Sequence, residues 1–141
     1  MSNREFFIKR FEQEYPIFVR VFKALPTDQI DYRPHERSKS ARELVWLFAT
    51  EGRMALELVD AGKTDWNDTP PSGTVEEMIA AFESGHTALA ERFKTLDDSA
   101  WGTTAQFLVG GHVALEMPLG EMMWLFLFDA VHHRGQLSTY I

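Results

Sequence analysis

The residues with the clearest chemical potential lie near the end of the chain, in the segment 129–136. Asp129 and His133 are four residues apart, so on a helix they lie on one face and can converge on a single metal ion. The segment follows seven consecutive apolar residues, Met122–Phe128, which must pack against the protein interior. Ionisable groups in such surroundings are costly unless they are paired or coordinated. The cluster is therefore predicted either to bind a cation or to belong to a polar network.

Three neighbours of this pair are expected to act around the ion rather than on it. His132 points about 100° away from His133 on a helix, so the two histidines cannot comfortably face the same ion. Gln136 follows His133 by three residues and is expected to hold a water molecule or to contact the ligands from outside, while Arg134 lies on the flank. Gly135 costs a helix about 1 kcal/mol relative to alanine, which predicts a close approach of another helix at this position.

A stable metal centre needs at least a third protein ligand. Glu51 is a candidate because this carboxylate falls on the apolar face of a predicted helix, one turn after Leu47. The alternative is that Glu51 is a boundary residue that pairs with Arg53 or Arg134. The remaining histidines are predicted to be packed or solvated rather than to bind metal, and they are His35, His86 and His112.

Four segments have the periodicity of amphipathic helices, and they are residues 3–25, 40–62, 74–96 and 118–141. The second and third begin with the capping-box patterns Ser40–Glu43 and Thr74–Glu77. Pro16 is expected to kink or divide the first helix. Four apolar stripes are most simply buried in a four-helix bundle. The fold class is therefore predicted to be all-α, with residues 1–141 as a single domain.

The connections between the helices predict two further features. Residues 26–39 and 63–73 are rich in polar residues, proline and glycine, which is typical of loops. Residues 105–117 resemble two short strands around a Gly110-Gly111 turn, which predicts a small hairpin before the last helix. This long connection also predicts a crossover before the last helix instead of a simple up-and-down order.

Composition argues against several classes of function. The chain has 141 residues, of which 45% are hydrophobic and 25% charged, as in an ordinary globular domain. It has no cysteine, which removes thiolate catalysis and cysteine-based zinc sites. The net charge of −7 and the lack of a basic run argue against a nucleic-acid partner. No signal-peptide pattern and no apolar run of bilayer length occur, which predicts a cytoplasmic protein without a membrane partner.

The segments Ser40–Leu44 and Phe128–Leu137 together resemble the DinB/YfiT-like superfamily of bacterial four-helix bundles. The resemblance implies a divalent metal, commonly zinc or nickel, that is held by one histidine from the second helix and two from the last helix. Carried over to this chain, the final histidine is His133, and Asp129 replaces the one before it. Leu47 occupies the position of the second-helix histidine. Aspartate is a competent oxygen ligand, whereas leucine cannot bind a metal.

Two outcomes follow from the leucine at position 47. Glu51 can complete a Glu/Asp/His site, whose oxygen ligands shift the preference away from zinc toward harder ions such as Mn²⁺ or Mg²⁺. Alternatively, Asp129 only holds His132 or His133 by a charge-assisted hydrogen bond. The first outcome predicts a metal-dependent enzyme, and the resemblance implies a hydrolase or a transferase that uses a low-molecular-weight thiol. The second predicts a non-catalytic bundle that dimerises or binds a small apolar ligand. The resemblance also implies a homodimer.

Overall fold

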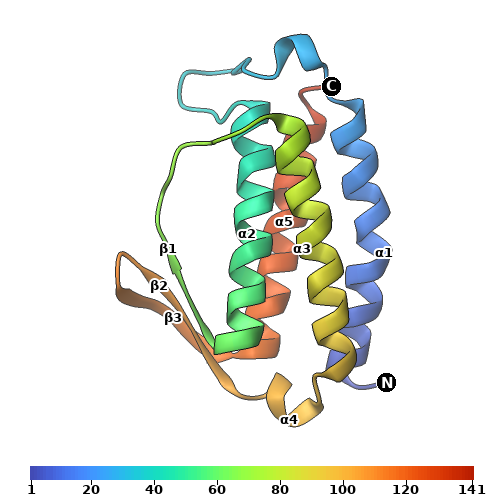
Figure 1. Ribbon diagram of the computed structural model, residues 1–141, viewed down its shortest axis with the longest axis vertical. Coiled ribbons are helices and arrows are strands. Elements are labelled where there is room, and N and C mark those ends of the chain that lie inside the picture. The colour runs from blue at the N-terminus through green and yellow to red at the C-terminus, as the bar shows by residue number, and fades with distance from the viewer.

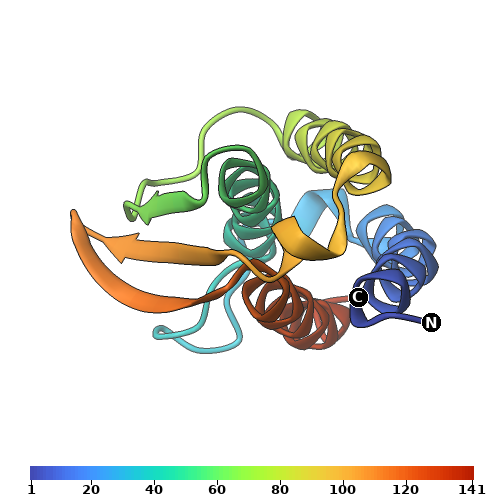
Figure 2. The same ribbon diagram turned by 90° about the horizontal axis from the view of Figure 1, so that it is seen from below.

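Four long helices pack side by side and form a bundle (Figure 1). The structure is a computed structural model and describes all residues, 1–141. The long helices are α1 (Asn3–Ala24), α2 (Ala41–Ala61), α3 (Val75–Thr95) and α5 (Leu119–Ser138). Seen end-on, they form a ring in the order α1, α3, α2, α5 (Figure 2). The predicted four-helix bundle is confirmed.

The helix ends follow the capping signals in the sequence. Each of α1, α2 and α3 begins with a capping box, in which a cap hydroxyl and a glutamate each accept a hydrogen bond from a free backbone N–H. The pairs are Ser2 with Glu5, Ser40 with Glu43, and Thr74 with Glu77. Gly62 ends α2 in the left-handed conformation, at φ 75°. Pro16 does not divide α1, because it lies on the exposed side while the apolar stripe on the other side packs without interruption.

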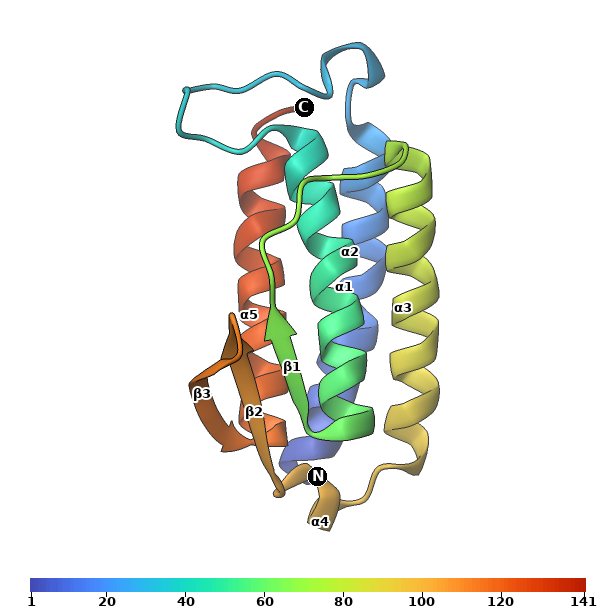
Figure 3. The same ribbon diagram turned by 60° about the vertical axis from the view of Figure 1, so that its left-hand side comes forward.

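A small three-stranded sheet lies beside α2 and α5 (Figure 3). Strands β2 (Thr104–Val109) and β3 (His112–Pro118) form the predicted hairpin, whose turn glycines both have positive φ. Strand β1 (Lys63–Trp66) pairs with β2 in parallel, so the sheet order is β1-β2-β3. The sequence predicts a loop for β1. That prediction is wrong because the partner strand lies far along the chain, where a local pattern cannot reveal it.

The crossover lies between α2 and α3 rather than before α5. These two helices run in the same direction, so the chain returns along the length of the bundle between them, and β1 begins this return (Figures 1 and 3). The connection before α5 instead contains the short helix α4 (Asp98–Trp101), which is capped by Asp97, and the hairpin. The loop between α1 and α2 contains one short 3-10 helix, η1 (Thr27–Gln29).

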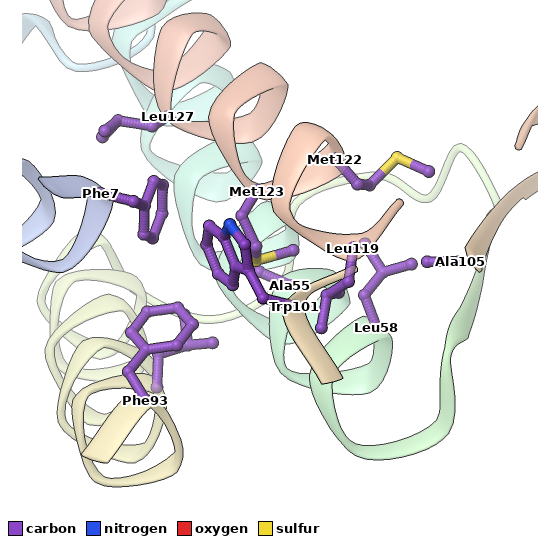
Figure 4. Close-up of a cluster of buried hydrophobic side chains, with 11 residues drawn as sticks. Phe7, Ala55, Leu58, Phe93, Trp101, Ala105, Leu119, Met122, Met123 and Leu127 are labelled. Carbon is purple, nitrogen blue, oxygen red and sulfur yellow. The ribbon is translucent and has the colours of Figure 1, made fainter. Parts of the chain in front are cut away.

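The buried core consists of two clusters, one toward each end of the bundle. The cluster near the hairpin includes Phe7, Phe93 and Met123, which come from three different long helices (Figure 4). The cluster near the loop between α1 and α2 includes Phe22 and Leu137. Other side chains occupy the middle of the bundle, between the two clusters. None of the helices combines the length and the hydrophobicity that crossing a bilayer requires.

Candidate metal centre

Side chains from α2 and α5 meet near the middle of the bundle. Glu51 on α2 approaches Asp129 and His133 on α5, and one potential ligand atom of each lies within 4.8 Å of those of the other two. Ligand atoms that share one ion lie up to about 4.4 Å apart, because metal–ligand distances are about 2.0–2.2 Å. Small side-chain rotations therefore suffice to bring all three donors onto one ion.

His133 is held by two side chains of its own helix, those of Gln136 and Asp129. Nδ1 of His133 lies 3.1 Å from the amide oxygen of Gln136, and Nε2 of His133 lies 3.4 Å from Oδ2 of Asp129. In the tautomer whose Nδ1–H donates to this amide oxygen, Nε2 keeps a lone pair that can bind a metal ion. That lone pair and the Asp129 carboxylate are both acceptors. They are compatible only when a proton or a metal ion lies between them.

Glu51 brings a fully buried carboxyl oxygen to the group. Its Oε2 atom is inaccessible to solvent and has no hydrogen-bond partner. Burial, together with the neighbouring Asp129 carboxylate, raises the pKa of Glu51 to about 10. At neutral pH the Glu51 carboxyl therefore keeps its proton in the metal-free protein. Metal binding requires deprotonated ligands, so a divalent cation would take the place of this proton.

The group is closed on its inner side and open on its outer side. The side chain of Asp129 is 49% exposed, whereas that of His133 is 18% exposed. A catalytic metal centre keeps a coordination position open for water or substrate, while a structural centre is closed by protein ligands on all sides. Three donors with one side open to solvent match the catalytic arrangement.

Arg134 is engaged elsewhere, on the other side of α5. Its guanidinium donates a hydrogen bond to Glu14 of α1 at 2.7 Å and lies 4.6 Å from the centroid of the Phe18 ring. Arg53 pairs with a glutamate of its own helix. The structure therefore brings neither arginine to Glu51, and the boundary-residue alternative for Glu51 is not observed.

Three further sequence predictions concern the surroundings of the group. His132 is exposed, and its ring centroid lies 5.1 Å from that of His133. His132 therefore lies at the solvent-facing edge of the group. Gly135 is also exposed, and a Cβ atom built there would meet nothing within 4 Å, so the predicted close approach of a helix at this position is wrong. Leu47 is buried in the core of the bundle and supplies no ligand.

Glu14 is the buried charged residue that the sequence reasoning missed. It is 8% exposed and accepts hydrogen bonds from Arg134 and Arg10, which lower the pKa of its carboxyl. A signal was available, because Glu14 lies three residues after Phe11 and four before Phe18. An acid at that spacing falls on the apolar face of the helix.

The fold and this group define a class of protein, namely four-helix bundles with a carboxylate–histidine group between two helices. The sequence profile of the DinB superfamily matches residues 10–137, and the chain belongs to this superfamily.

Two solved structures from Bacillus subtilis share the fold. YfiT, described as a probable metal-dependent hydrolase with an unusual four-helix bundle topology, is 13% identical with a TM-score of 0.74, and the match covers 99% of this chain and 87% of YfiT. The DinB-like protein YjoA is 16% identical with a TM-score of 0.72, and the match covers 95% of this chain and 88% of YjoA. No curated protein matches the chain.

Proposed function

We propose that the chain binds a divalent metal ion through Glu51, Asp129 and His133 and acts as a metal-dependent hydrolase. The observation that carries the proposal is the buried, unpartnered Oε2 atom of Glu51 beside two further donors. A buried carboxyl oxygen without a partner is costly, and coordination of a cation between α2 and α5 would remove that cost. The description of YfiT as a probable metal-dependent hydrolase supports the same class of reaction.

The donor set indicates which ions fit. Two carboxylates and one imidazole suit Mn²⁺, Ni²⁺ and Zn²⁺, and the majority of oxygen donors makes Mn²⁺ more competitive here than at an all-histidine site. With Glu51 and Asp129 ionised and His133 neutral, the ligands carry two negative charges, which balance a divalent cation. The aspartate in place of a second histidine on α5 therefore shifts the relative preference toward Mn²⁺ and keeps the capacity to bind a divalent ion.

Each residue of the group has a distinct role in the proposed reaction. The metal ion would supply Lewis acidity that activates water toward a substrate carbonyl. Glu51 anchors the ion from the interior, and Gln136 keeps Nε2 of His133 directed at it. Asp129 borders the solvent, where a substrate enters. In the hydrolysis itself, water adds to the acyl carbon, and the leaving group departs with the proton that the water gives up.

Calorimetric titration of untagged, chelator-treated protein with MnCl₂, NiCl₂ and ZnCl₂ tests metal binding. One ion per chain is expected, with binding abolished in Glu51→Gln and in His133→Ala. The matched control is Glu121→Gln, which removes an exposed carboxylate from α5 and should leave the affinity unchanged. If none of the three ions binds stoichiometrically to the parent protein, the proposal is wrong.

An activity assay then separates hydrolysis from thiol transfer, the other reaction that the family resemblance implies. The metal-loaded protein is incubated with p-nitrophenyl acetate, with and without glutathione. Hydrolysis predicts release of nitrophenol without the thiol, and loss of this release in Glu51→Gln. A reaction that requires glutathione and consumes it would instead assign transfer to the thiol.

A further inference from the structure

Helix α5 has apolar residues on nearly all sides, although one of its sides is exposed. In α1, α2 and α3 the apolar residues gather on one face, whereas in α5 they are spread around the helix. A helix that is hydrophobic all round is normally covered on every side. The side of α5 that faces away from the other helices is nevertheless uncovered by any other element of the chain (Figure 2). Such an uncovered apolar side is typical of an interaction surface.

Four exposed residues form a stripe along this side of α5. They follow one another at intervals of four, three and four residues, which is the spacing of one helix face, and they are Glu121, Leu125, Phe128 and His132. Phe128 is 61% exposed and Leu125 is 44% exposed, so the centre of the stripe is apolar and open to water. The ring of Phe128 also contacts that of Trp124, which in turn contacts the exposed ring of Phe6. The apolar surface is therefore continuous across several side chains.

The order of residues in the stripe is symmetric. The polar residues Glu121 and His132 form its two ends, the apolar residues Leu125 and Phe128 form its centre, and the members of each pair lie equally far from the midpoint. In a two-fold contact, a residue i that meets residue j of the other copy is itself met by i of that copy at j. Two antiparallel copies of α5 therefore bring Leu125 against Phe128 and Glu121 against His132, both at the same register.

The polar ends of the stripe are complementary in the antiparallel arrangement. Neither Glu121 nor His132 takes part in an ion pair within the chain. An imidazole ring carries an N–H whether it is neutral or charged, and this N–H can donate a hydrogen bond to the Glu121 carboxylate of a second copy. A parallel arrangement would instead place the two Glu121 carboxylates side by side, which is unfavourable.

We infer that the stripe is an interaction surface for a second copy of this chain, with the two α5 helices packed antiparallel about a two-fold axis between Leu125 and Phe128. The contact removes the apolar centre from water, and each polar end gains a hydrogen-bond partner. The stripe borders the candidate metal centre at Asp129, the residue after Phe128, but includes none of its three ligands. The inference therefore goes beyond the proposed function and does not depend on it.

Sedimentation equilibrium of the full chain in EDTA measures the association without a contribution from metal ions. A concentration-dependent dimer is expected for the parent protein. Leu125→Glu places a carboxylate in the apolar centre and should raise the dissociation constant of the dimer by about tenfold or more, equivalent to about 1.4 kcal/mol. Tyr32→Glu is the matched control, because it replaces an exposed aromatic residue in the loop between α1 and α2, and it should leave the dissociation constant unchanged. If Leu125→Glu fails to fold, Phe128→Lys tests the same contact at the other apolar position.

Disulfide formation tests the orientation of the two helices, because the chain contains no cysteine of its own. Glu121→Cys and His132→Cys, one of them labelled with a heavy isotope, are mixed and oxidised. The antiparallel contact predicts disulfides between the two different variants, which mass spectrometry identifies. Either variant alone should form few disulfides, because identical positions lie eleven residues, or about 16 Å, apart along the helices, and a disulfide cannot span that distance.

A parent protein that remains monomeric at every concentration measured would overturn the inference, as would a dimer that a folded Leu125→Glu or Phe128→Lys variant leaves intact. Preferential disulfides between identical positions would contradict it as well, because they would show a parallel contact. Since no metal ion is present in these experiments, their outcome is separate from that of the metal titration.

Discussion

The carboxyl group of Glu51 has a buried oxygen and lies close to a second carboxyl group, that of Asp129. Its carboxyl is kept protonated by burial and by Asp129, so the metal-free protein holds a proton where the loaded protein would hold a cation. This predicts a pH dependence of stability with a definite sign. The folded-state pKa is raised to about 10 from 4.5. The stability that Glu51 contributes is therefore complete below pH 4.5 and is lost as the pH rises toward 10.

We expect Glu51→Gln to remove this loss. Glutamine does not ionise, so in EDTA the free energy of unfolding of the variant should exceed that of the parent increasingly from about pH 5 to pH 9, by a difference on the order of 1 kcal/mol per pH unit. Urea unfolding at several pH values measures it. Glu121→Gln, at an exposed position, should follow the parent at every pH. Parallel curves for the parent and Glu51→Gln would show that the Glu51 carboxyl ionises freely in the folded protein.

The spacing and polarity of individual residues in the sequence predicted most members of the candidate site. Asp129 and His133 followed from the i, i+4 rule, and Glu51 followed from a carboxylate on an apolar face. The partner of Arg134 could not be derived in the same way. Glu14 lies on a different helix, and only the packing of α1 against α5 shows that the two meet.

At the scale of elements, a glycine marks the close contact between α4 and α5. Gly120 is buried, and a Cβ atom there would overlap the indole of Trp101. That indole also donates a hydrogen bond to Oδ1 of Asn3 at 2.9 Å, which ties the short helix to the start of α1. The sequence placed the close approach at Gly135 instead. Both glycines cost helix propensity, and only the packed structure shows which of them meets a neighbour.

Gly120→Ala should therefore destabilise the protein, and Gly135→Ala should stabilise it. Forcing a methyl group into a packed contact costs about 1–3 kcal/mol, whereas alanine in open space gains up to about 1 kcal/mol of helix propensity. Chemical denaturation of the two variants gives both values under one set of conditions. Equal effects of the same sign would contradict the contact between Gly120 and Trp101.

At the scale of the whole molecule, the direction of each helix was the least predictable feature. The helices and the hairpin followed from capping signals, periodicity and the Gly110-Gly111 turn. The parallel course of α2 and α3 did not, because it depends on which faces pack together after collapse. The return of the chain between them creates β1, whose pairing with β2 is equally non-local. The sequence therefore predicted the parts of the bundle more fully than their order in space.

The pair formed by Glu14 and Arg134 joins α1 to α5 and so closes the ring of four helices (Figure 2). Both side chains are largely buried, at 11% and 15% exposure. Removing one partner of a buried pair leaves an uncompensated charge and costs about 3–5 kcal/mol, whereas replacing both by apolar residues is often nearly neutral. Arg10 also binds Glu14 and is 43% exposed, so it compensates part of the lost charge.

We therefore expect Arg134→Met to lower the free energy of unfolding by about 3 kcal/mol, the lower end of that range. The double variant Glu14→Leu/Arg134→Met should recover most of this loss, because no buried charge remains without a partner. A double-mutant cycle with Glu14→Leu alone measures the coupling by urea unfolding. Additive effects of the two substitutions would mean that the two residues act independently. The ring of helices would then be closed by apolar packing between α1 and α5 without a contribution from this ion pair.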